Sequence, residues 1–557
     1  LQAALHLTLA RSYSSLTLYA ATEREARRAL ELSYALGPAE RIEAALSLTR
    51  ALSALDRWAE ASAVAEAWAE DPAFSRARAS TRFALRRIGH TVKVRQGAPA
   101  EAASGLEALL AESRNDLGPD DPISLGIETR LAEAMIAAGR DGEAEALLRA
   151  RIAAGGTGSP DTLPALDARF LLTRAVASQG RHAEARVLLE EVVPLIRARY
   201  GVDHSRTRVA VAGLAAAYQK TGDTARAAPL FEAVAEAWEE REGPHHSETL
   251  TARANHARAL AALGDARADE LLRGAFEGRE RLFGPDNPRT LQGLYLWADQ
   301  LRRDGRLEEA EPLFLDVIAR AERAAPDQDV PLHRYRAHLG LLRLHQGRAT
   351  EAAELLLLAW EGFAAAAGPL DSETLVVGMN YGTSLGEVGN WSEAVDVLIA
   401  ILSDMRESLP ADDPMLRSAL NNLAHAHLQR GESRLALARL LDALEWADEN
   451  LPSEDPQRLK ALDRVGTQLV GLDRPDEALT YFEELSASVD LNPDLDALTR
   501  SSFRLGYARC LAACGRLDAA EEEYETVLEM ERARLAGADA AAIAQLEDEL
   551  RAVQRRR

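Results

Sequence analysis

The sequence predicts an all-α solenoid, a stack of about 13 antiparallel helix pairs, and two observations lead to this fold class. A glycine-centred phrase, clearest at residues 305–310 (GRLEEA), recurs at a spacing of 41 to 42 residues. The composition is 47 % hydrophobic but only 5 % aromatic, and the abundance of alanine and leucine is typical of helices. Self-similarity at a fixed period indicates units that stack on their neighbours, so these 557 residues need no single large core.

Thirteen positions carry the phrase or fill its slot, and we use them as anchors that number each repeat from zero. We expect the repeats to occupy residues 1–535 and a capping helix and tail to occupy residues 536–557, since a solenoid needs a polar end cap. The repeat at Gly347 departs from the pattern because Arg343 stands at −4, where other copies have Leu or Tyr. The anchors are Thr17, Asp56, Gly97, Gly139, Gly180, Gly222, Gly264, Gly305, Gly347, Gly389, Gly431, Asp473 and Gly515.

The first helix of each predicted pair precedes the anchor. A large residue at −8 stands beside a small one at −7, as in Trp297-Ala298 and Tyr381-Gly382. A small residue on the packed face lets a second helix approach closely. The anchor glycine then ends the first helix, because glycine adopts the left-handed conformation at little cost.

The second helix is marked by an alanine near +5, as at Ala310, which we expect to face the first helix. Between repeats, Asp or Asn followed by Pro predicts a capped helix start. The glycine-rich residues 155–158 lie in the same loop class and have no strand before them, so we do not interpret them as a phosphate loop. The capped starts are Asp121-Pro122, Asn287-Pro288, Asp413-Pro414 and Asp455-Pro456.

These residues resemble the tetratricopeptide repeat, whose consensus has the large-small pair, the turn glycine and the alanine at these positions. Its usual unit has 34 residues, whereas this one has about 42, and repeats of this longer kind are similar to those of kinesin light chain and its bacterial relatives. Residues 283–291 (FGPDNPRTL) and 420–424 (LNNLA) carry that likeness. The resemblance implies a right-handed superhelical solenoid that acts as a protein–protein interaction scaffold. HEAT and armadillo repeats lack the glycine–alanine pairing.

Positions −13, −9, −6 and −2 share one stripe of the first helix, and the resemblance implies that this stripe lines a concave groove. From the repeat at Gly139 to that at Gly515, the stripe holds nine basic and four acidic residues, in a chain of net charge −23. This local inversion favours an acidic peptide ligand, while ordinary solvated arginines on a helix face stay the alternative. The candidate groove residues are Arg130, Arg174, Lys220, Asn255, Arg258, Arg303, Arg334, His338, Asn380, Asn422, Lys460, Arg464 and Arg509.

Two finer hypotheses come from the resemblance. An asparagine at −9, present as Asn255, Asn380 and Asn422, matches the one that faces the groove in kinesin light chains, where an amide can both donate to and accept from a peptide backbone. Some tetratricopeptide domains hold two carboxylates of a chaperone C-terminus in a five-residue clamp. This chain matches three of those positions with Asn422, Lys460 and Arg464, and departs at the other two, Met379 and Thr383.

The sequence predicts no cofactor, no metal site and no catalytic centre. The pairs Cys510/Cys514 and His338/His345 lack further ligands nearby, and a pH-sensitive groove charge is the alternative for the histidines. HExxH, GxSxG, P-loop and kinase catalytic-loop signatures do not occur. The acidic balance argues against nucleic acid, and no apolar run is long enough to enter a membrane. Two cysteines favour a reducing compartment and hence a cytoplasmic location.

Two function hypotheses remain. In the first, the chain is a scaffold that binds peptide segments or partner domains in its groove. In the second, it is the regulatory or substrate-recruiting region of a larger bacterial enzyme, a serine/threonine protein kinase, whose catalytic domain lies outside this fragment. The start at Leu1, within a helical pattern, and the similarity of residues 1–32 to the first repeat after such kinase domains favour the second hypothesis.

Overall fold

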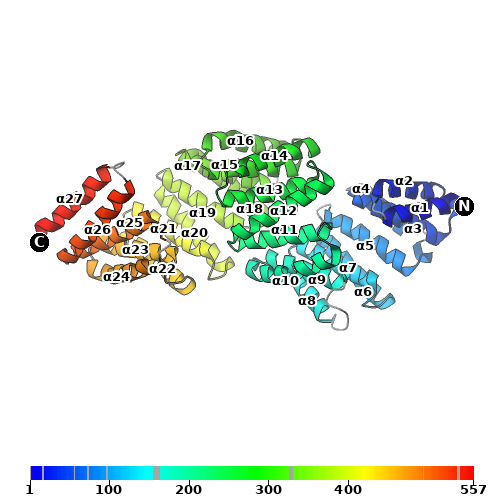
Figure 1. Ribbon diagram of the computed structural model, residues 1–557, viewed down its shortest axis with the longest axis horizontal. Helices are drawn as coiled ribbons and strands as arrows, with labels where there is room; N and C mark the ends of the chain where they lie inside the picture. Colours follow the sequence, from blue (N-terminus) through cyan, green and yellow to red (C-terminus); the bar gives the residue numbers. More distant parts are fainter. Residues whose placement is uncertain are drawn as a thin grey trace. The chain divides into compact units, whose positions relative to one another are not determined.

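The computed structural model describes residues 2–15, 18–55, 57–71, 74–95, 98–154, 163–324, 330–492, 495–535 and 540–557. These residues form 27 α-helices, two short 3-10 helices and no strand, which confirms the all-α fold class. Within each unit, most helices pack against the next one in sequence, and α27 packs against α26. In chain order, α1 to α26 make 13 successive pairs. Figure 1 labels the helices. The chain divides into two compact units, Leu1–Gly278 and Arg279–Arg557, which we describe separately.

Unit 1 holds the first six helix pairs, and α14 contains the division between the units. Its anchors Thr17, Asp56 and Gly97, and the glycine-rich residues 155–158, lie outside the described residues. Its helices are α1 (Gln2–Ser15), α2 (Tyr19–Glu31), α3 (Pro38–Ala54), α4 (Trp58–Ala69), α5 (Ala79–Arg95), α6 (Pro99–Asp116), α7 (Pro122–Ala137), α8 (Asp141–Ala154), α9 (Leu163–Ser178), α10 (His182–Tyr200), α11 (Ser205–Lys220), α12 (Thr224–Glu242), α13 (Ser247–Ala262) and α14 (Arg267–Phe283), with 3-10 helices η1 (Ser33–Ala35) and η2 (Phe74–Arg76).

Unit 2 holds the end of α14, the six pairs from α15 to α26, and the last helix α27, whereas α13 and most of α14 belong to unit 1. Its helices are α15 (Pro288–Arg303), α16 (Leu307–Ala324), α17 (Val330–His345), α18 (Ala349–Ala367), α19 (Ser372–Glu387), α20 (Trp391–Ser408), α21 (Pro414–Gln429), α22 (Ser433–Asn450), α23 (Pro456–Gly471), α24 (Pro475–Leu491), α25 (Ala497–Ala513), α26 (Leu517–Leu535) and α27 (Ala540–Arg556).

The anchor residues turn the chain from the first to the second helix of each pair. The nine anchor glycines in the described residues all have positive φ, for example 75° at Gly305. Asp473 occupies the same slot with φ of 59°, and among the described residues it is the one non-glycine in this region. Asp tolerates the left-handed conformation better than most residues because its short side chain can bond locally. The predicted turn is therefore confirmed, and Asp473 forms it at some conformational cost.

The small residue at −7 sets how closely two paired helices approach. At Gly382, an added Cβ would lie 2.9 Å from Leu398 of the second helix, and at Gly466 it would lie 2.7 Å from Phe482. Both large residues stand at +9 from their anchors. Contacts this short are not tolerated between carbon atoms, so a larger −7 residue would push the helices apart.

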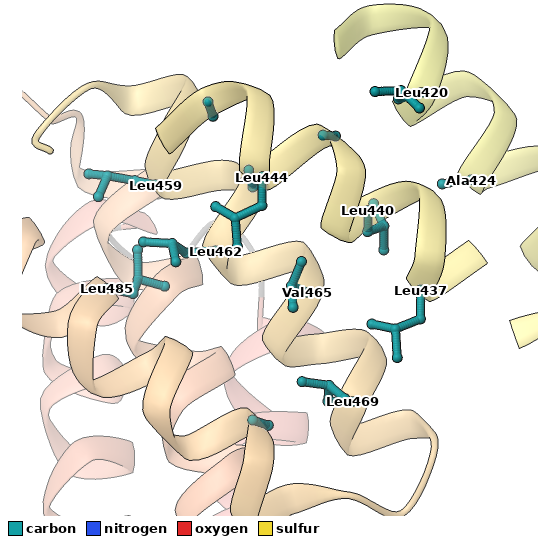
Figure 2. Close-up of a cluster of buried hydrophobic side chains, with 14 of the residues drawn as sticks. Leu420, Ala424, Leu437, Leu440, Leu444, Leu459, Leu462, Val465, Leu469 and Leu485 are labelled. Carbon is teal, nitrogen blue, oxygen red and sulfur yellow. The ribbon is translucent and has the colours of Figure 1, made fainter. Parts of the chain in front are cut away.

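The core of each pair continues from this contact. The alanine at +5 is buried in every pair where it is described, with no exposure at Ala310 or Ala436. Large side chains from successive helices then interdigitate around it. Figure 2 shows such a cluster across α21 to α24, formed by Leu420, Ala424, Leu437, Leu440, Leu444, Leu459, Leu462, Val465, Leu469 and Leu485.

The predicted helix caps are present. The side chains of Asp121, Asn287, Asp413 and Asp455 each accept a hydrogen bond from the backbone N–H two residues on, at 2.7 to 2.9 Å. Proline occupies the first turn of these four helices. This arrangement satisfies a backbone donor that the helix itself leaves unpaired.

Two histidines cap helices where the Asp-Pro phrase is missing. Nδ1 of His204 accepts from the backbone N–H of Arg206 at 3.1 Å, and Nδ1 of His246 accepts from that of Glu248 at 3.3 Å. An imidazole can accept through Nδ1 only while that nitrogen carries no proton. The start of α11 therefore depends on a neutral His204.

The irregular repeat at Gly347 keeps its register. Gly347 has φ of 73°, and Ala352 at +5 is fully buried. Arg343, at −4, is also buried, and its guanidinium lies 2.5 Å from Glu311 of the preceding pair. A buried charge is tolerated when it is paired and hydrogen-bonded. An inter-repeat ion pair thus takes the place of the usual apolar contact.

None of the helices in the described ranges combines the length and the apolar character needed to cross a bilayer.

We expect Asp473→Gly to stabilise unit 2 by about 1 kcal/mol, because glycine removes the cost of the left-handed turn. The measurement is the shift of the urea unfolding midpoint. Gly431→Asp is the matched control at the preceding anchor, where an added Cβ has open space and only the backbone conformation matters. It should shift the midpoint the opposite way, and a stabilising Gly431→Asp would contradict the explanation.

We expect the stability of the chain to fall on acidification partly through His204. Burial and the charges of Arg206, Arg208 and Arg241 lower the pKa of His204. The unfolded histidine, with a pKa of about 6.5, then binds protons that the folded one resists, so stability is lost as pH falls through that value. His204→Asn keeps a capping side chain that does not titrate. Between about pH 7.5 and about pH 5.5, the unfolding midpoint should fall further in the natural chain than in this variant, and equal slopes would exclude the role.

Candidate functional site

The thirteen candidate groove residues all lie on the first helices of their pairs, in both units. In unit 1 they are Arg130 on α7, Arg174 on α9, Lys220 on α11, and Asn255 and Arg258 on α13. In unit 2 they are Arg303 on α15, Arg334 and His338 on α17, Asn380 on α19, Asn422 on α21, Lys460 and Arg464 on α23, and Arg509 on α25.

A cavity of about 390 Å³ in unit 2 brings part of the stripe together. It is lined from α19 to α23, and the first helices of three consecutive pairs contribute most of its polar side chains. Asn422 and Arg464 are the two candidates that line it. Six of its lining residues occupy stripe positions, namely Thr383, Glu387, Asn422, His425, Arg464 and Thr467.

The amide groups of this cavity are oriented by the helices. Nδ2 of Asn422 donates to Oγ1 of Thr383 at 3.3 Å, and that hydroxyl donates to the carbonyl of Met379 at 3.0 Å. Nδ2 of Asn421 donates to the carbonyl of Arg417 at 2.9 Å, while its Oδ1 is buried without a partner among the described residues. Each amide thus has one N–H bonded within the protein, and its oxygen is an acceptor of the kind that a peptide N–H requires.

Charge in the cavity is mixed. Arg464 stands beside Glu387 and Asp463 in its lining. Burial raises the pKa of Asp463 to about 6, and Arg464 opposes that shift. The stripe does not predict Asp463, because −10 lies outside it. A possible signal is Gly506 on the next first helix, where an added Cβ would lie 2.9 Å from Oδ1 of Asp463.

Aromatic and imidazole rings form another wall of the cavity. Trp391 and His425 meet edge to face, with ring centroids 5.5 Å apart. The Trp391 ring packs over Gly386, where any side chain would collide with it. The cavity therefore offers an apolar surface beside its acceptors.

A hydrogen-bonded network in unit 2 unites Arg303 and His338. The Asp299 carboxylate, 8 % exposed, accepts from Arg303 at 2.9 Å, Arg302 at 2.8 Å and His338 Nδ1 at 2.8 Å. Nε2 of His338 lies 3.0 Å from the hydroxyl of Tyr295. Burial opposes ionisation of Asp299, but the His338 hydrogen bond and the two guanidinium groups hold its pKa well below the usual range. This network joins two consecutive first helices.

Three more basic candidates are ion-paired. Arg130 pairs with Glu133, Arg334 with Glu373 and Arg509 with Glu549. The basic stripe residues that form no ion pair within the described residues are Arg174, Lys220, Arg258, Lys460 and Arg464. The cationic character of the stripe therefore rests on these five.

In unit 1, a cavity of about 300 Å³ brings Arg130 and Arg174 together. Glu133 and Asp167 also line it, and Arg206 pairs with Asp167. Lys220, Asn255 and Arg258 lie further along the unit and line none of the cavities described here; the same holds for Asn380 in unit 2.

Metal-ligand chemistry is weakly represented in the described ranges, where no three His, Cys, Asp or Glu side chains gather as a ligand set. Sγ of Cys510 donates to the carbonyl of Pro475 at 3.4 Å, and burial raises the pKa of this thiol to about 12. Such a thiol behaves as a small core residue rather than as a nucleophile.

Comparison with known proteins agrees with the repeat geometry. Residues 171–240 and 249–289 each match a tetratricopeptide-repeat family. A solved structure of putative kinesin light chain TPR-like repeats from Podosopora anserina is 26 % identical, and the match covers 37 % of this chain and 99 % of that one with a TM-score of 0.34. BtubC (BKLC) from P. vanneervenii is 17 % identical over 49 % of this chain and 93 % of its own, with a TM-score of 0.32. No curated protein matches the chain.

The predicted tetratricopeptide repeats are thus confirmed, and kinesin light chain repeats are among those to which the chain is similar. Repeats of this kind bind protein partners. The tetratricopeptide repeats thus indicate a protein–protein interaction scaffold.

Proposed function

We propose that unit 2 binds an extended peptide segment of a partner protein in the cavity lined by α19, α21 and α23. The observation that supports this proposal is the identity of the lining, since six of its residues occupy the stripe positions that the sequence predicts to face a groove. A cavity of about 390 Å³ accommodates a few side chains, not a whole domain.

The acceptor oxygens of the cavity suit a peptide backbone. Oδ1 of Asn421 is buried and unpartnered among the described residues, and one N–H of the Asn422 amide donates to Thr383. A buried acceptor without a partner costs about 1 to 3 kcal/mol. A peptide N–H that reached it would recover that free energy without reading the side chain. Trp391 would supply the apolar contact for a neighbouring residue.

A preference for acidic segments would come from α23. Lys460 and Arg464 lie one helical turn apart, are exposed, and form no ion pair within the described residues. Arg464 lines the cavity together with the acidic Glu387 and Asp463, whereas Lys460 lies outside its lining. The preference therefore concerns the part of the ligand that passes α23, rather than its whole length. Asn422, Lys460 and Arg464 also match three of the five positions of the carboxylate clamp, so binding of a C-terminal carboxylate stays a hypothesis.

The double variant Lys460→Gln/Arg464→Gln should weaken binding of an acidic peptide library by about tenfold, which corresponds to roughly 1.4 kcal/mol. The reason is the loss of two unpaired cations beside the ligand. Binding is measured by fluorescence anisotropy against a neutral library of the same length, at two salt concentrations, since charge contacts weaken as salt rises.

The control for this experiment is Arg406→Gln/Arg434→Gln. It removes the same charge from the same unit, at exposed positions on the second helices α20 and α22. It should leave affinity within about twofold. Equal losses in both double variants would show that only net charge matters, and would refute a groove on α23.

The second hypothesis, recruitment for a larger enzyme such as a serine/threonine kinase, stays a prediction, as does a cytoplasmic location.

A further inference from the structure

A second, different cavity lies in unit 1. Its volume is about 400 Å³, and arginines from three consecutive first helices line it: Arg50 on α3, Arg87 on α5 and Arg130 on α7. In the two cavities described above, carboxylates share the lining with the arginines. Here the other lining residues are Ser14, Tyr19, Ser53, Trp58, Ile88 and Thr91, and none is acidic. We call this cavity the arginine pocket.

The helices bring these guanidinium groups close together. α3 contacts α5, and α5 contacts α7. The side chain of Arg87 reaches α7 at Gly126, where any Cβ would collide with its guanidinium. Gly126 lies one helical turn before Arg130. Burial, and then the charges of Arg130 and Arg50, lower the pKa of Arg87 to about 10. All three cations are therefore within electrostatic reach of one another.

Counter-charge in the pocket is incomplete. Arg130 pairs with Glu133, the carboxylate that also acts favourably on Arg87. Within the described residues, neither Arg50 nor Arg87 forms an ion pair. Three guanidinium groups against one carboxylate leave about two uncompensated positive charges. Like charges that share a partly desolvated site repel one another, so an anion that entered would relieve the repulsion.

The guanidinium groups are the charged donors in the pocket. The hydroxyl of Ser53 donates to the carbonyl of Thr49 at 2.8 Å, and that of Thr91 to the carbonyl of Arg87 at 2.9 Å. Both hydroxyls are thus committed to their own helices. An oxyanion would bind through planar N–H forks, the geometry that matches carboxylate and phosphate oxygens.

We propose that the arginine pocket binds the phosphoryl group of a phosphorylated serine or threonine on a peptide segment that follows the first helices. A phosphomonoester carries about −1.5 to −2 charge near neutral pH and three acceptor oxygens, which suits three forks and about two net positive charges. Arg50 and Thr91 stand at −6, and Arg130 and Ile88 at −9, so the pocket occupies the same stripe as the unit 2 cavity. The proposal rests on the proposed function and extends it to phosphorylation-dependent partners.

A phosphopeptide fits better than the other anions. A single carboxylate would leave about one positive charge uncompensated. Nucleic acid would bring a long polyanion to a chain of net charge −23. Trp58 and Tyr19 add aromatic surface at the pocket for residues that flank the phosphorylated one.

The test uses the full chain and two labelled oriented peptide libraries that differ only in a central phosphoserine or serine. Fluorescence anisotropy should show that the phosphoserine library binds at least about tenfold tighter. Arg50→Gln and Arg87→Gln should each remove most of that preference. Arg86→Gln should keep it, because Arg86 lies on the same helix but pairs with Glu112, outside the pocket. Arg50 is exposed near the end of α3, so its variant should fold normally, as circular dichroism can verify.

Several results would overturn the proposal. They are equal binding of the two libraries, a phosphoserine preference that survives both Arg50→Gln and Arg87→Gln, competition by single-stranded DNA of mixed sequence as strong as by phosphopeptide, or inorganic phosphate that binds as tightly as the phosphopeptide. Failure of the proposed function is distinguishable from these results. It would appear as unchanged binding of the acidic library by the Lys460→Gln/Arg464→Gln variant. The phosphoserine preference is scored on different residues in the other unit.

Discussion

The contact between the small residue at −7 and the large residue at +9 governs this structure. At Gly382 and Leu398 there is no room for one additional carbon. This close approach fixes the spacing within a pair and buries the +5 alanine against the first helix. It also commits one face of each first helix to its partner. The positions that this contact leaves uncommitted include −13, −9, −6 and −2, and six residues at the last three of them line the unit 2 cavity. Packing inside the pair thus determines which face of the first helix stays available for the proposed peptide.

Much of the fold could be predicted from the sequence because it is encoded over short distances. The left-handed anchors, the Asp-Pro caps and the −8/−7 pairs all act within a few residues. Arg343 departs from the pattern, but the repeat at Gly347 keeps its register. The site was less predictable, because its electrostatics depend on partners in the next repeat. Glu373 lies 39 residues from Arg334, and Glu549 lies 40 from Arg509, so each pairing follows from stacking geometry that composition does not reveal. Asp463 was not predicted, because it stands outside the stripe and its surroundings include Gly506 of another helix.

Net charge and local charge separate clearly in this chain. Its formal charge of −23 conceals a pocket in unit 1 whose lining has three arginines and no carboxylate. In unit 2 the opposite holds, because several stripe arginines form ion pairs with Asp or Glu side chains that the sequence alone does not reveal. Counting charges along a predicted face therefore overstates the cationic surface where repeats donate acids to one another. It understates that surface where arginines outside the counted positions gather, as Arg50 and Arg87 do in the arginine pocket.

The division between the −7/+9 contact and the stripe has a consequence for how such a chain diverges over time. Residues that hold a pair together and residues that meet a ligand stand at different positions of the same helix, so mutation can alter one set with little effect on the other. Duplication of one helix pair would copy all the contacts that stabilise it, while its stripe residues could still change. Asp299 shows the limit of this freedom. Its bonds to Arg303 and His338 join stripe residues of neighbouring repeats, so a substitution at one of them affects the others.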